Sequence, residues 1–400
     1  MPDAVIVATS RTPIGRANKG SLAEARPDDM SAFIIKDVLS KVPQLQTDSV
    51  EDVLWGTGQP GGEQGYNIAR MSSLLAGIDA PGVTVNRYCS SSLQTIRMAF
   101  HAIKAGEGDV FIAGGVECVS RYQFGASDTG SHNDSFKDAE TRTAERTGEG
   151  VETWAPPQGL PDVYIAMGQT AENVAQSKGV SREDQDAWGV RSQNRAEAAA
   201  ARGFFEREIT PYTVPDGTVV TADDGIRTGT TYESVSQLKP VFRPDGTVTA
   251  GNACPLNDGA AAVVVMSEEK ASELGVTPLA KIVASGVSAL NPEIMGLGPI
   301  DAINQTLQRA GMAITDIDLV EINEAFAAQV LPSAEETGID HDKLNVNGGA
   351  IALGHPFGMT GARIMTTLIN GLEDTDKEFG LETMCVGGGQ GMAMIVQRMS

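Results

Sequence analysis

Residues 84–103 read TVNRYCSSSLQTIRMAFHAI, and residues 345–369 read NVNGGAIALGHPFGMTGARIMTTLI. Both stretches begin with an extended segment, turn at small residues and continue as a helix whose apolar residues recur every three or four positions. Each is followed by a strand, within DVFIAGGVE at 109–117 and within ETMCVGGGQG at 382–391. This repetition predicts two α/β halves that arose by duplication. Chance similarity among α/β segments is the alternative interpretation.

The flanking segments extend the repeat. A predicted helix precedes each half, at residues 30–39 and 300–310, and a strand of small residues closes each half, DGAAAVVVMS and QGMAMIVQRMS. Strands that alternate with helices are typical of βα units and of mixed or parallel sheets. The predicted strands are residues 4–8, 50–55, 83–86, 110–113, 260–266, 280–284, 319–322 and 392–397.

The length of 400 residues also favours more than one domain. We predict an N-terminal α/β half formed by residues 1–119 and 246–270, and a C-terminal α/β half formed by residues 271–400. Residues 120–245, which differ in composition from both halves, are predicted to form an inserted loop domain between them.

The insertion itself has three parts. Residues 128–152 contain seven acidic and three basic side chains and few apolar ones, which indicates a loop or lid. Residues 182–202 have a helical pattern that opens on Ser181, with Asp184 three positions later as in a capping box. Residues 210–249 are rich in Gly, Pro and Thr and indicate loops and hairpins. An exposed insertion beside two α/β halves is suited to gripping a long substrate.

Charge and composition exclude several kinds of partner. The net charge of −22 argues against nucleic acid and against anionic membranes, and it requires a local basic patch for any anionic substrate. No apolar stretch approaches 18 residues and the first residues lack a signal-peptide pattern, so we expect a cytoplasmic protein without a membrane partner. The four cysteines form no C-x-x-C pair, so we expect neither a metal site nor disulfides.

Cys89 is the first candidate for chemistry. It lies where a predicted strand meets a predicted helix, and the hydroxyls of Ser90, Ser91 and Ser92 are available for capping. A helix N-terminus lowers the pKa of a thiol, and its free N–H groups can hold an oxyanion. The alternative is a buried cysteine in a tight turn.

His355 is the best candidate for a general base among four histidines. It lies in a glycine-rich turn, GGAIALGHPFGMTGAR at residues 348–363, where the backbone can approach a ligand closely. A hydrogen-bonded structural histidine is the alternative. Two further positions follow predicted strands: Cys385, before Gly387, and Asn323, where polar groups commonly meet ligand.

Together these segments resemble the thiolase family, and the resemblance spans essentially the whole chain. The specific matches are NRYCSSS at residues 86–92, NEAFA at 323–327, GHP at 354–356 and CVG at 385–387, with softer matches at 167–172, 252–262 and 295–296. The resemblance implies duplicated α/β halves in a layered αβαβα arrangement, with an inserted loop domain that binds coenzyme A (CoA).

The resemblance also implies a mechanism. Cys89 would attack the keto carbon of a 3-oxoacyl-CoA with His355 as base, and Cys385 would protonate the departing acetyl-CoA carbanion. A second CoA would then take the acyl group from Cys89, and the reverse reaction would be a Claisen condensation. His355 and a water held by Asn323 would form one oxyanion hole, and the N–H groups of Cys89 and Gly387 would form the other.

Positions for binding CoA and substrate follow from the same resemblance. They are Arg227 and Ser234 at the nucleotide end, Cys254 near the pantetheine, Met167 and Met295 as pocket walls, and Phe326 within the NEAFA segment. The family implies CoA as a substrate, no tightly bound cofactor and a homodimer or homotetramer.

Two departures from the family pattern bear on the substrate. Biosynthetic members usually carry His where this chain has Ala166, and Ser is common where it has Cys254. We therefore expect degradative thiolysis of chains longer than acetoacetyl-CoA, with a short-chain acetyl-CoA acetyltransferase as the alternative.

Three alternative classes of protein can each be distinguished from a thiolase. A ketosynthase would lack Cys385. A non-catalytic acyl-CoA or lipid-binding relative would have lost Cys89, His355 or Cys385, and all three are present. A cysteine hydrolase would turn over without acceleration by free CoA.

Overall fold

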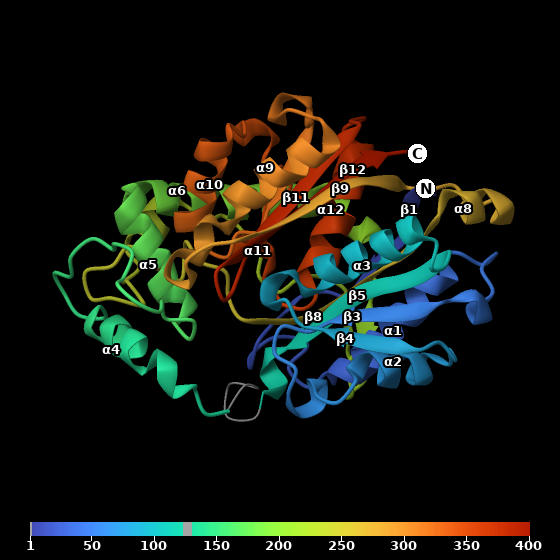
Figure 1. The fold of residues 1–400 in the computed structure, drawn as a ribbon, viewed down its shortest axis with the longest axis horizontal. Coiled ribbons are helices and arrows are strands. Elements are labelled where there is room, and N and C mark those ends of the chain that lie inside the picture. Colours follow the sequence, from blue (N-terminus) through green and yellow to red (C-terminus); the bar gives the residue numbers. More distant parts are fainter. Residues whose placement is uncertain (1, 123–129) are drawn as a thin grey trace.

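The computed structural model describes residues 2–122 and 130–400. Its N-terminal half is built on five strands of four or more residues (Figure 1). Their order in the sheet is β4-β3-β5-β8-β1, with β3 parallel to both β4 and β5 and with β8 antiparallel to β5 and β1. Their bounds are β1 (Ala4–Arg11), β3 (Asp52–Gly56), β4 (Gly82–Val85), β5 (Val110–Cys118) and β8 (Asn257–Ser267). A two-residue strand, β2 (Gly15–Arg16), pairs with β8.

The C-terminal half repeats this pairing pattern. Its strands follow the order β10-β11-β12-β9, with β10 parallel to β11 and the remaining neighbours antiparallel. Their bounds are β9 (Ala280–Ala289), β10 (Leu319–Ile322), β11 (Phe379–Val386) and β12 (Gln390–Arg398). Two residue pairs between β1 and β9 join the halves into one continuous sheet. The predicted duplication and the predicted strands are confirmed.

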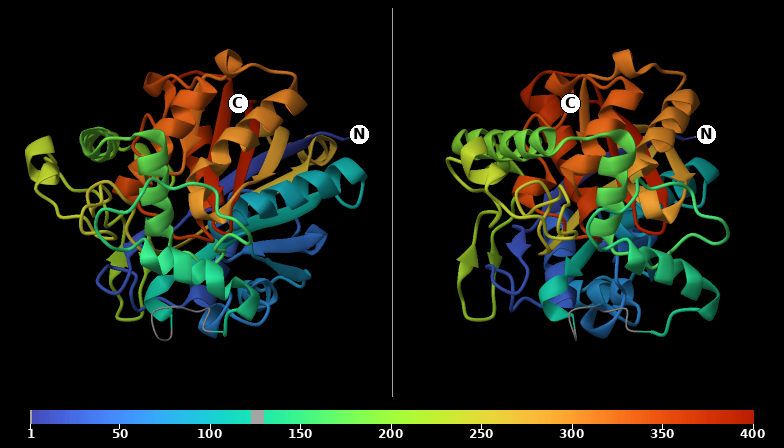
Figure 2. Two further views of the ribbon diagram at one scale, coloured as in Figure 1. Left: turned by 60° about the vertical axis from the view of Figure 1, so that its left-hand side comes forward. Right: turned by 90° about the vertical axis from the view of Figure 1, so that its left-hand side faces the viewer.

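Helices separate the two half-sheets and cover their outer faces (Figures 1 and 2). The central layer is α3 (Ser91–Ala105) and α12 (Thr360–Asp374), whose apolar residues share one core with strands of both halves. The outer layers are α1 (Pro27–Ser40) with α2 (Ile68–Ala76) on one side and α9 (Gly298–Ala310) with α10 (Ala327–Thr337) on the other. The result is the expected αβαβα layering. Two short helices, α8 (Glu268–Leu274) and α11 (Ala350–Leu353), lie in connections.

The insertion contains more helix than its composition suggested. Residues 128 and 129 of the acid-rich segment lie outside the described residues, and its remainder includes α4 (Lys137–Glu145) at the periphery of the molecule (Figure 1). The expected loop is therefore partly wrong, because the Ala, Glu, Lys and Arg residues of α4 favour helix even where little apolar surface is buried. The other elements are α5 (Met167–Lys178), α6 (Arg182–Ala201), α7 (Tyr232–Ser236) and the hairpin of β6 (Tyr212–Thr213) with β7 (Val219–Val220).

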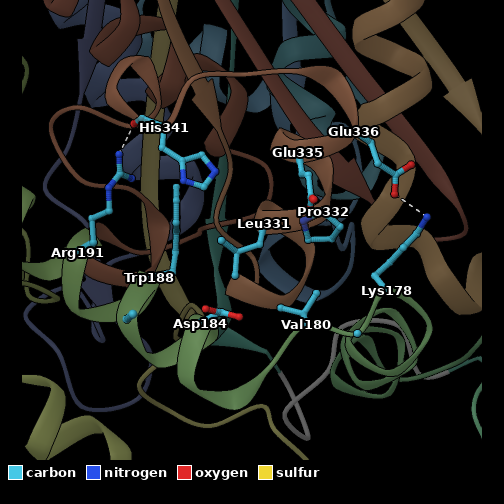
Figure 3. A pocket seen from close by; sticks show the side chains of 12 residues that line it. Lys178, Val180, Asp184, Trp188, Arg191, Leu331, Pro332, Glu335, Glu336 and His341 are labelled. Atoms are coloured by element: carbon cyan, nitrogen blue, oxygen red, sulfur yellow. Dashed lines mark hydrogen bonds and ion pairs between the residues drawn. The ribbon is translucent and has the colours of Figure 1, made fainter.

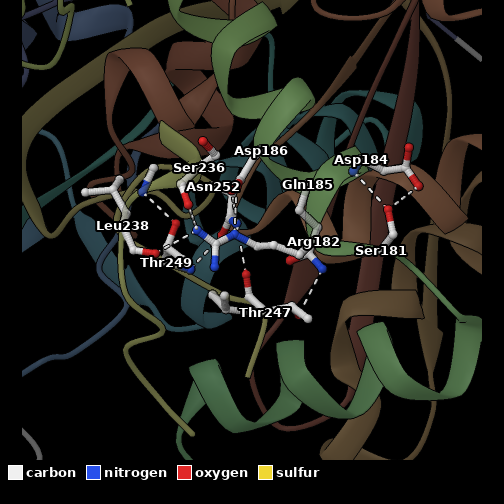
Figure 4. Close-up of polar contacts among 12 residues, drawn as sticks. Ser181, Arg182, Asp184, Gln185, Asp186, Ser236, Leu238, Thr247, Thr249 and Asn252 are labelled. Atoms are coloured by element: carbon white, nitrogen blue, oxygen red, sulfur yellow. Dashed lines mark hydrogen bonds and ion pairs between the residues drawn. The ribbon is translucent and has the colours of Figure 1, made fainter. Parts of the chain in front are cut away.

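Hydrogen bonds at the start of α6 connect the insertion to the segment that leads into β8. The Ser181 hydroxyl accepts a hydrogen bond from the Asp184 N–H at 3.0 Å, which confirms the predicted cap. Arg182 Nε donates to Asp186 at 2.7 Å, and Asp186 in turn accepts from Asn252 Nδ2 at 2.8 Å (Figure 4). This buried network joins the insertion to the segment that leads into the N-terminal half-sheet.

Charged side chains are also buried between the halves. Arg11 of β1 donates to Glu208 at 2.9 Å, and both are inaccessible to solvent. Nearby, Glu321 of β10 and Glu382 of β11 are register partners on adjacent parallel strands. Burial raises the pKa of Glu321 to about 8 and the pKa of Glu382 well above its usual range, although the Arg363 guanidinium lowers both. These two carboxyls are thus held largely in the neutral form at neutral pH.

Among the described residues, no helix combines the length and the apolar character needed to cross a bilayer.

Candidate active site

Cys89 lies in a single 3₁₀ turn, Tyr88–Ser90, between β4 and α3. The turn is tight, because Tyr88 has a positive φ of 43° and its N–H donates to Asn86 Oδ1 at 2.8 Å. The Ser91 hydroxyl accepts from the Arg87 N–H at 2.9 Å and donates to the Tyr88 carbonyl at 2.7 Å. The sequence pattern of strand, turn and helix therefore places the thiol at the point where the chain reverses.

The expected serine caps of α3 are wrong in detail. Ser90, the N-cap residue, makes no side-chain hydrogen bond to the free N–H groups of the helix. Its hydroxyl donates to Arg87 O instead, and the Ser92 hydroxyl accepts from the Ala362 N–H of α12 at 2.9 Å. These hydroxyls stabilise the turn and connect the two central helices, so the helix N-terminus beside Cys89 is left without a side-chain cap.

The electrostatic environment of Cys89 also differs from expectation. The side chain is 8% exposed, and burial raises the pKa of the thiol to about 12. Hydrogen bonds from the backbone of Gly387 and of Cys89 itself lower the pKa but do not outweigh the loss of hydration. The predicted net lowering is therefore wrong, and the thiol is protonated at neutral pH. As a nucleophile it needs a base.

His355 occupies the turn between α11 and α12, not a strand-to-helix turn, and is fully buried. Its Nδ1 lies 2.6 Å from Thr360 Oγ1, and the Thr360 hydroxyl donates to Pro356 O at 2.7 Å. Because a hydroxyl has only one hydrogen to donate, Thr360 must accept from Nδ1–H. Nε2 is then unprotonated and accepts a hydrogen bond from Asn323 Nδ2–H at 3.3 Å.

The pKa of His355 keeps its imidazole neutral. Burial and the positive charge of Arg363 lower the pKa of the imidazole to about 3. Its backbone N–H donates to Asn257 Oδ1 at 2.9 Å, and Asn257 Nδ2 donates to Gly15 O at 2.9 Å. The turn is therefore fixed from both the side chain and the backbone. Thr360 and Asn257 were not identified from the sequence, where only a threonine five positions after the histidine could have indicated the first.

Asn323 and Glu324 follow β10, as the sequence predicts. Asn323 Oδ1 is buried and has no hydrogen-bond partner among the described residues, so it offers an acceptor for a water or a ligand. Glu324 is fully buried and accepts from Trp188 Nε1 at 3.0 Å and from the Ile351 N–H at 3.2 Å. Glu324 thus links the segment that holds Asn323 to α6 and α11.

Cys385 ends β11 and lies close to the other candidate thiols. It is fully buried, and burial together with the proximity of Cys89 and Cys254 raises the pKa of its thiol well above the usual range. Gly387, two residues later, approaches the turn of Cys89 so closely that an added Cβ would lie 3.3 Å from the Tyr88 ring. The ends of β4 and β11, which occupy different halves, therefore bring the two thiols to one place.

Most of the predicted binding residues gather around these thiols. One apolar cluster contains Cys385, Met295 and Phe326, with Met167 and Cys254 packed against it. Ser234 does not join this group: its hydroxyl donates to Thr231 O at 2.7 Å within the cap of the short helix α7. Nothing in its contacts marks Ser234 as a ligand-binding residue.

Two cavities open on the site. The first, of about 260 Å³, is lined by Cys89 and Gly387 and by the side chains of Gln59, Tyr88, Val163, Tyr164, Ile165, Ala166, Met167 and Phe357. The second, of about 250 Å³, is lined by Cys254, Phe242, Val241, Arg16 and Arg227. A ligand that enters either cavity therefore meets a thiol, that of Cys89 in the first and that of Cys254 in the second.

A larger cavity, of about 830 Å³, lies elsewhere, between α5, α6 and α10 (Figure 3). Both of its cationic side chains have partners: Lys178 pairs with Glu336 at 2.5 Å, and the Arg191 guanidinium lies 4.4 Å from the Trp188 ring centroid. It contains none of the candidate thiols and no candidate base, so we do not place the reaction there. Within the described ranges, no group of three or more His, Cys, Asp or Glu side chains is arranged to hold a metal ion.

Comparison with known proteins agrees with this geometry. The profile of the thiolase N-terminal domain matches residues 4–269, and that of the thiolase C-terminal domain matches residues 276–398. A 3-ketoacyl-CoA thiolase of Bacillus subtilis (strain 168) is 43% identical over 99% of this chain and 100% of its own length. A beta-ketoadipyl-CoA thiolase of Acinetobacter baylyi is 43% identical over the full length of both proteins. The crystal structure of the Bacillus anthracis acetyl-CoA acetyltransferase superposes with a TM-score of 0.86 at 37% identity, over 100% of this chain and 99% of that one.

The chain therefore belongs to the thiolase family. It is an acyltransferase enzyme with thiolase activity, and CoA is its substrate.

Proposed function

We propose that this thiolase cleaves 3-oxoacyl-CoA with a second CoA, through an acyl group on Cys89, to give acetyl-CoA and an acyl-CoA shortened by two carbons. The observation that carries the proposal is the proximity of the buried thiols of Cys89 and Cys385, with one cavity lined by Cys89 and a second lined by the neighbouring Cys254. We infer that the neutral imidazole of His355 lies within reach of these thiols. A carbon–carbon cleavage needs both a nucleophile and a separate acid for the carbanion.

The first step uses Cys89 and His355. The unprotonated Nε2 of His355 takes the proton of the Cys89 thiol, and the thiolate adds to C3 of the substrate. The N–H groups of Cys89 and Gly387, which both lower the pKa of this thiol, are placed to hold the oxyanion that forms on C3. When the C2–C3 bond breaks, the electron pair goes to C2 and the acyl group stays on Cys89.

Cys385 completes the cleavage. Its thiol gives a proton to C2, and the resulting acetyl-CoA leaves. His355 with a water on Asn323 would stabilise the enolate of the thioester, and the unpaired Asn323 Oδ1 supports a bound water there. The sulfur of the incoming CoA then attacks the acyl-Cys89 carbonyl, the bond between the acyl carbon and Cys89 breaks, and the Cys89 thiolate takes its proton back from His355. Cys385 is reprotonated in the same cycle by the proton released from CoA.

The direction and chain length are part of the proposal. The 260 Å³ cavity beside Cys89 is lined mainly by apolar and aromatic side chains, and among the described residues no charged side chain lines it. We therefore expect a degradative role, of the kind found in fatty-acid β-oxidation, on uncharged acyl chains longer than acetoacetyl. A terminal carboxylate, as in a beta-ketoadipyl chain, would find no cation there. A short-chain acetyl-CoA acetyltransferase remains the second candidate, because the Bacillus anthracis neighbour carries that name.

The four cysteines provide the test. Mass spectrometry of the protein, incubated with acetyl-CoA and then quenched, should show an acyl group on Cys89. Cys385→Ala should retain this acylation and lose carbon–carbon bond formation, because acyl exchange needs no carbanion. Cys118→Ala is the matched control, since Cys118 is also fully buried but lies in another core cluster. Acylation of Cys254 with Cys89 bare, or loss of acylation in Cys385→Ala, would contradict the assignment.

We also propose the division into residues 1–119 with 246–270, 120–245 and 271–400, which the repeated strand pairing supports. A homodimer or homotetramer is proposed as the assembly. The strand β4 ends the sheet, and Leu74 and Leu75 on the adjacent α2 are 57% and 48% exposed. A second copy could pair along this edge and cover these side chains. Light scattering that gives the mass of a single chain at micromolar concentration would contradict it.

A further inference from the structure

We propose that Arg16 is a second phosphate-binding residue for CoA, acting together with Arg227 on the nucleotide half of the substrate. The inference rests on the proposed function and adds a residue that neither the sequence motifs nor the proposed mechanism requires. It begins from the cavity of about 250 Å³ that both arginines line.

The composition of this cavity is unusual for so acidic a protein. The sequence carries 52 acidic and 30 basic residues, yet within the part of the chain that the structure describes the cavity is lined by two arginines and by no acidic side chain. Its other walls are small or apolar, among them Val241, Phe242 and Cys254. A polyanionic ligand can enter such a cavity without meeting a like charge at the wall.

Both guanidinium groups are also free of protein partners. Arg16 and Arg227 are exposed, and within the described ranges neither makes a side-chain hydrogen bond or ion pair. By contrast, Arg26 and Arg121 on a neighbouring surface both pair with Glu63. Two unpaired arginines that converge on one cavity are matched to phosphate oxygens, which they can bind in a bidentate manner.

Hydrogen bonds connect the backbone of Arg16 to the segment that holds His355. Arg16 pairs with Asn257 in the ladder of β2 and β8, and its N–H donates to Asp224 Oδ2 at 2.9 Å. The side chain of Asn257 accepts from the His355 N–H and donates to Gly15 O. One asparagine therefore fixes both the backbone of His355 and the strand that carries Arg16, so the fold sets the position of the Arg16 backbone relative to His355.

The remaining rim of the cavity fits the rest of a nucleotide. Val241, which lines the cavity, is 59% exposed, and Leu256, whose carbonyl accepts from the Ala17 N–H beside β2, is 54% exposed. Apolar side chains next to two cations give an adenine ring and its phosphates complementary surfaces. The pantetheine arm would then run past Cys254 toward Cys89.

The test is the dependence of thiolysis on CoA, on 3′-dephospho-CoA and on pantetheine. Arg16→Ala should raise the KM for CoA about tenfold with kcat nearly unchanged, because a lost hydrogen bond to a charged group weakens binding by at least that factor. The KM for pantetheine, which has no phosphate, should not change. If the effect of the substitution vanishes with 3′-dephospho-CoA, the contact is to the 3′-phosphate; if it persists, the contact is to the diphosphate.

Two control variants define the result. Lys19→Ala removes one exposed positive charge from the same segment but not from the cavity wall, and it should leave the KM for CoA unchanged. Arg16→Lys should give an intermediate KM, because it keeps the charge and loses the planar fork. An unchanged KM for CoA in Arg16→Ala, or an equal rise for pantetheine, would overturn the inference. Absence of CoA-dependent thiolysis in the unaltered protein would instead overturn the proposed function.

Discussion

At the scale of single residues, the tautomer of the neutral His355 imidazole depends on one hydroxyl. The Thr360 hydroxyl donates its only hydrogen to Pro356 O, and it can therefore only accept from Nδ1–H of the imidazole. The tautomer with an unprotonated Nε2, the one a general base requires, is therefore imposed by the first turn of α12. A neutral imidazole of the other tautomer would present a hydrogen to Asn323 and could not accept the proton of Cys89.

The first prediction concerns this hydroxyl. Thr360→Val should lower kcat for thiolysis by about 10- to 100-fold, in the range expected for impaired general-base catalysis, while leaving the KM for CoA little changed. The reason is that valine fills the same volume but cannot accept from Nδ1–H. Thr360→Ser, which restores the acceptor, is the matched control and should recover most of the rate. Equal losses in both variants would assign Thr360 a packing role instead.

The second prediction concerns the pH dependence of His355. A base whose pKa is lowered to about 3 stays neutral as the pH falls through 6.5, where an exposed histidine gains its charge. Nitrogen NMR of isotope-labelled histidine can follow this directly, since the chain has only four histidines and His355→Ala identifies the signal. We expect no protonation of His355 between pH 8 and pH 5. A midpoint within that range would show that burial does not control this imidazole.

The residues that carry chemistry were partly readable from the sequence. Cys89, His355 and Cys385 could be picked out because each follows a strand or lies in a turn of small residues. Thr360 and Asn257 could not, because their roles depend on which atoms approach His355 after folding. The pKa of Cys89 was predicted in the wrong direction because the local helix effect is visible in the sequence, whereas burial between two halves is not.

At the scale of elements, α5 determines one wall of the acyl cavity. Ala166 is the N-cap of this helix and Met167 is its first residue, and both line the 260 Å³ cavity with Cys89. The methyl group of Ala166 leaves space that a larger side chain would fill. The N-terminus of α5 is thus where a single substitution can change the length of chain accepted.

The third prediction follows from this wall. The kcat/KM for thiolysis of 3-oxoacyl-CoA should rise from C4 to C8, because each buried methylene contributes about 0.8 kcal/mol, roughly a fourfold gain. Ala166→His should reduce the C8 value and spare the C4 value, whereas Ala166→Gly, which adds no bulk and is tolerated at an N-cap, should keep the wild-type order. The series C4, C6, C8 and C12 measures the effect. A steady decline from C4 in the unaltered enzyme would favour the short-chain acetyltransferase.

Elements differed in how well the sequence predicted them. The strands were found because alternating and continuous apolar runs reflect burial within a half-sheet, and the cap of α6 was found because Ser181 and Asp184 act locally. The helix α4 was missed because only Ala139 of it is buried, so it lacks the apolar periodicity that marks a core helix. The serine cap of α3 was wrong because the hydroxyl of the N-cap residue Ser90 donates to Arg87 O, and the Ser92 hydroxyl accepts from α12, 270 residues away.

At the scale of the whole molecule, duplication places equivalent strands of the two halves side by side and buries the junction between them. The pairing of β1 with β9 continues one sheet into the other, and α3 and α12 pack between them. This arrangement brings Cys89 from one half and Cys385 from the other to one site. It also encloses acidic side chains of β10 and β11 in the interior, where Arg363 is the nearest compensating charge.

The last prediction tests the cost of that enclosure. Glu321 is 4% exposed, and its pKa is raised to about 8 from an ordinary value near 4.5. Between these two pH values the unfolded chain has released the proton and the folded chain retains it, so this group makes the protein less stable as the pH rises. The slope is at most about 1.4 kcal/mol per pH unit.

Glu321→Gln keeps the shape of the side chain and cannot ionise. Its free energy of unfolding, relative to the unaltered protein, should therefore increase steadily from pH 5 to pH 8 in urea titrations. Glu107→Gln, at an exposed position, should show no such trend. A difference between Glu321→Gln and the unaltered protein that stays constant, or that falls as the pH rises, would mean that Glu321 is ionised in the folded protein and that Arg363 compensates its charge.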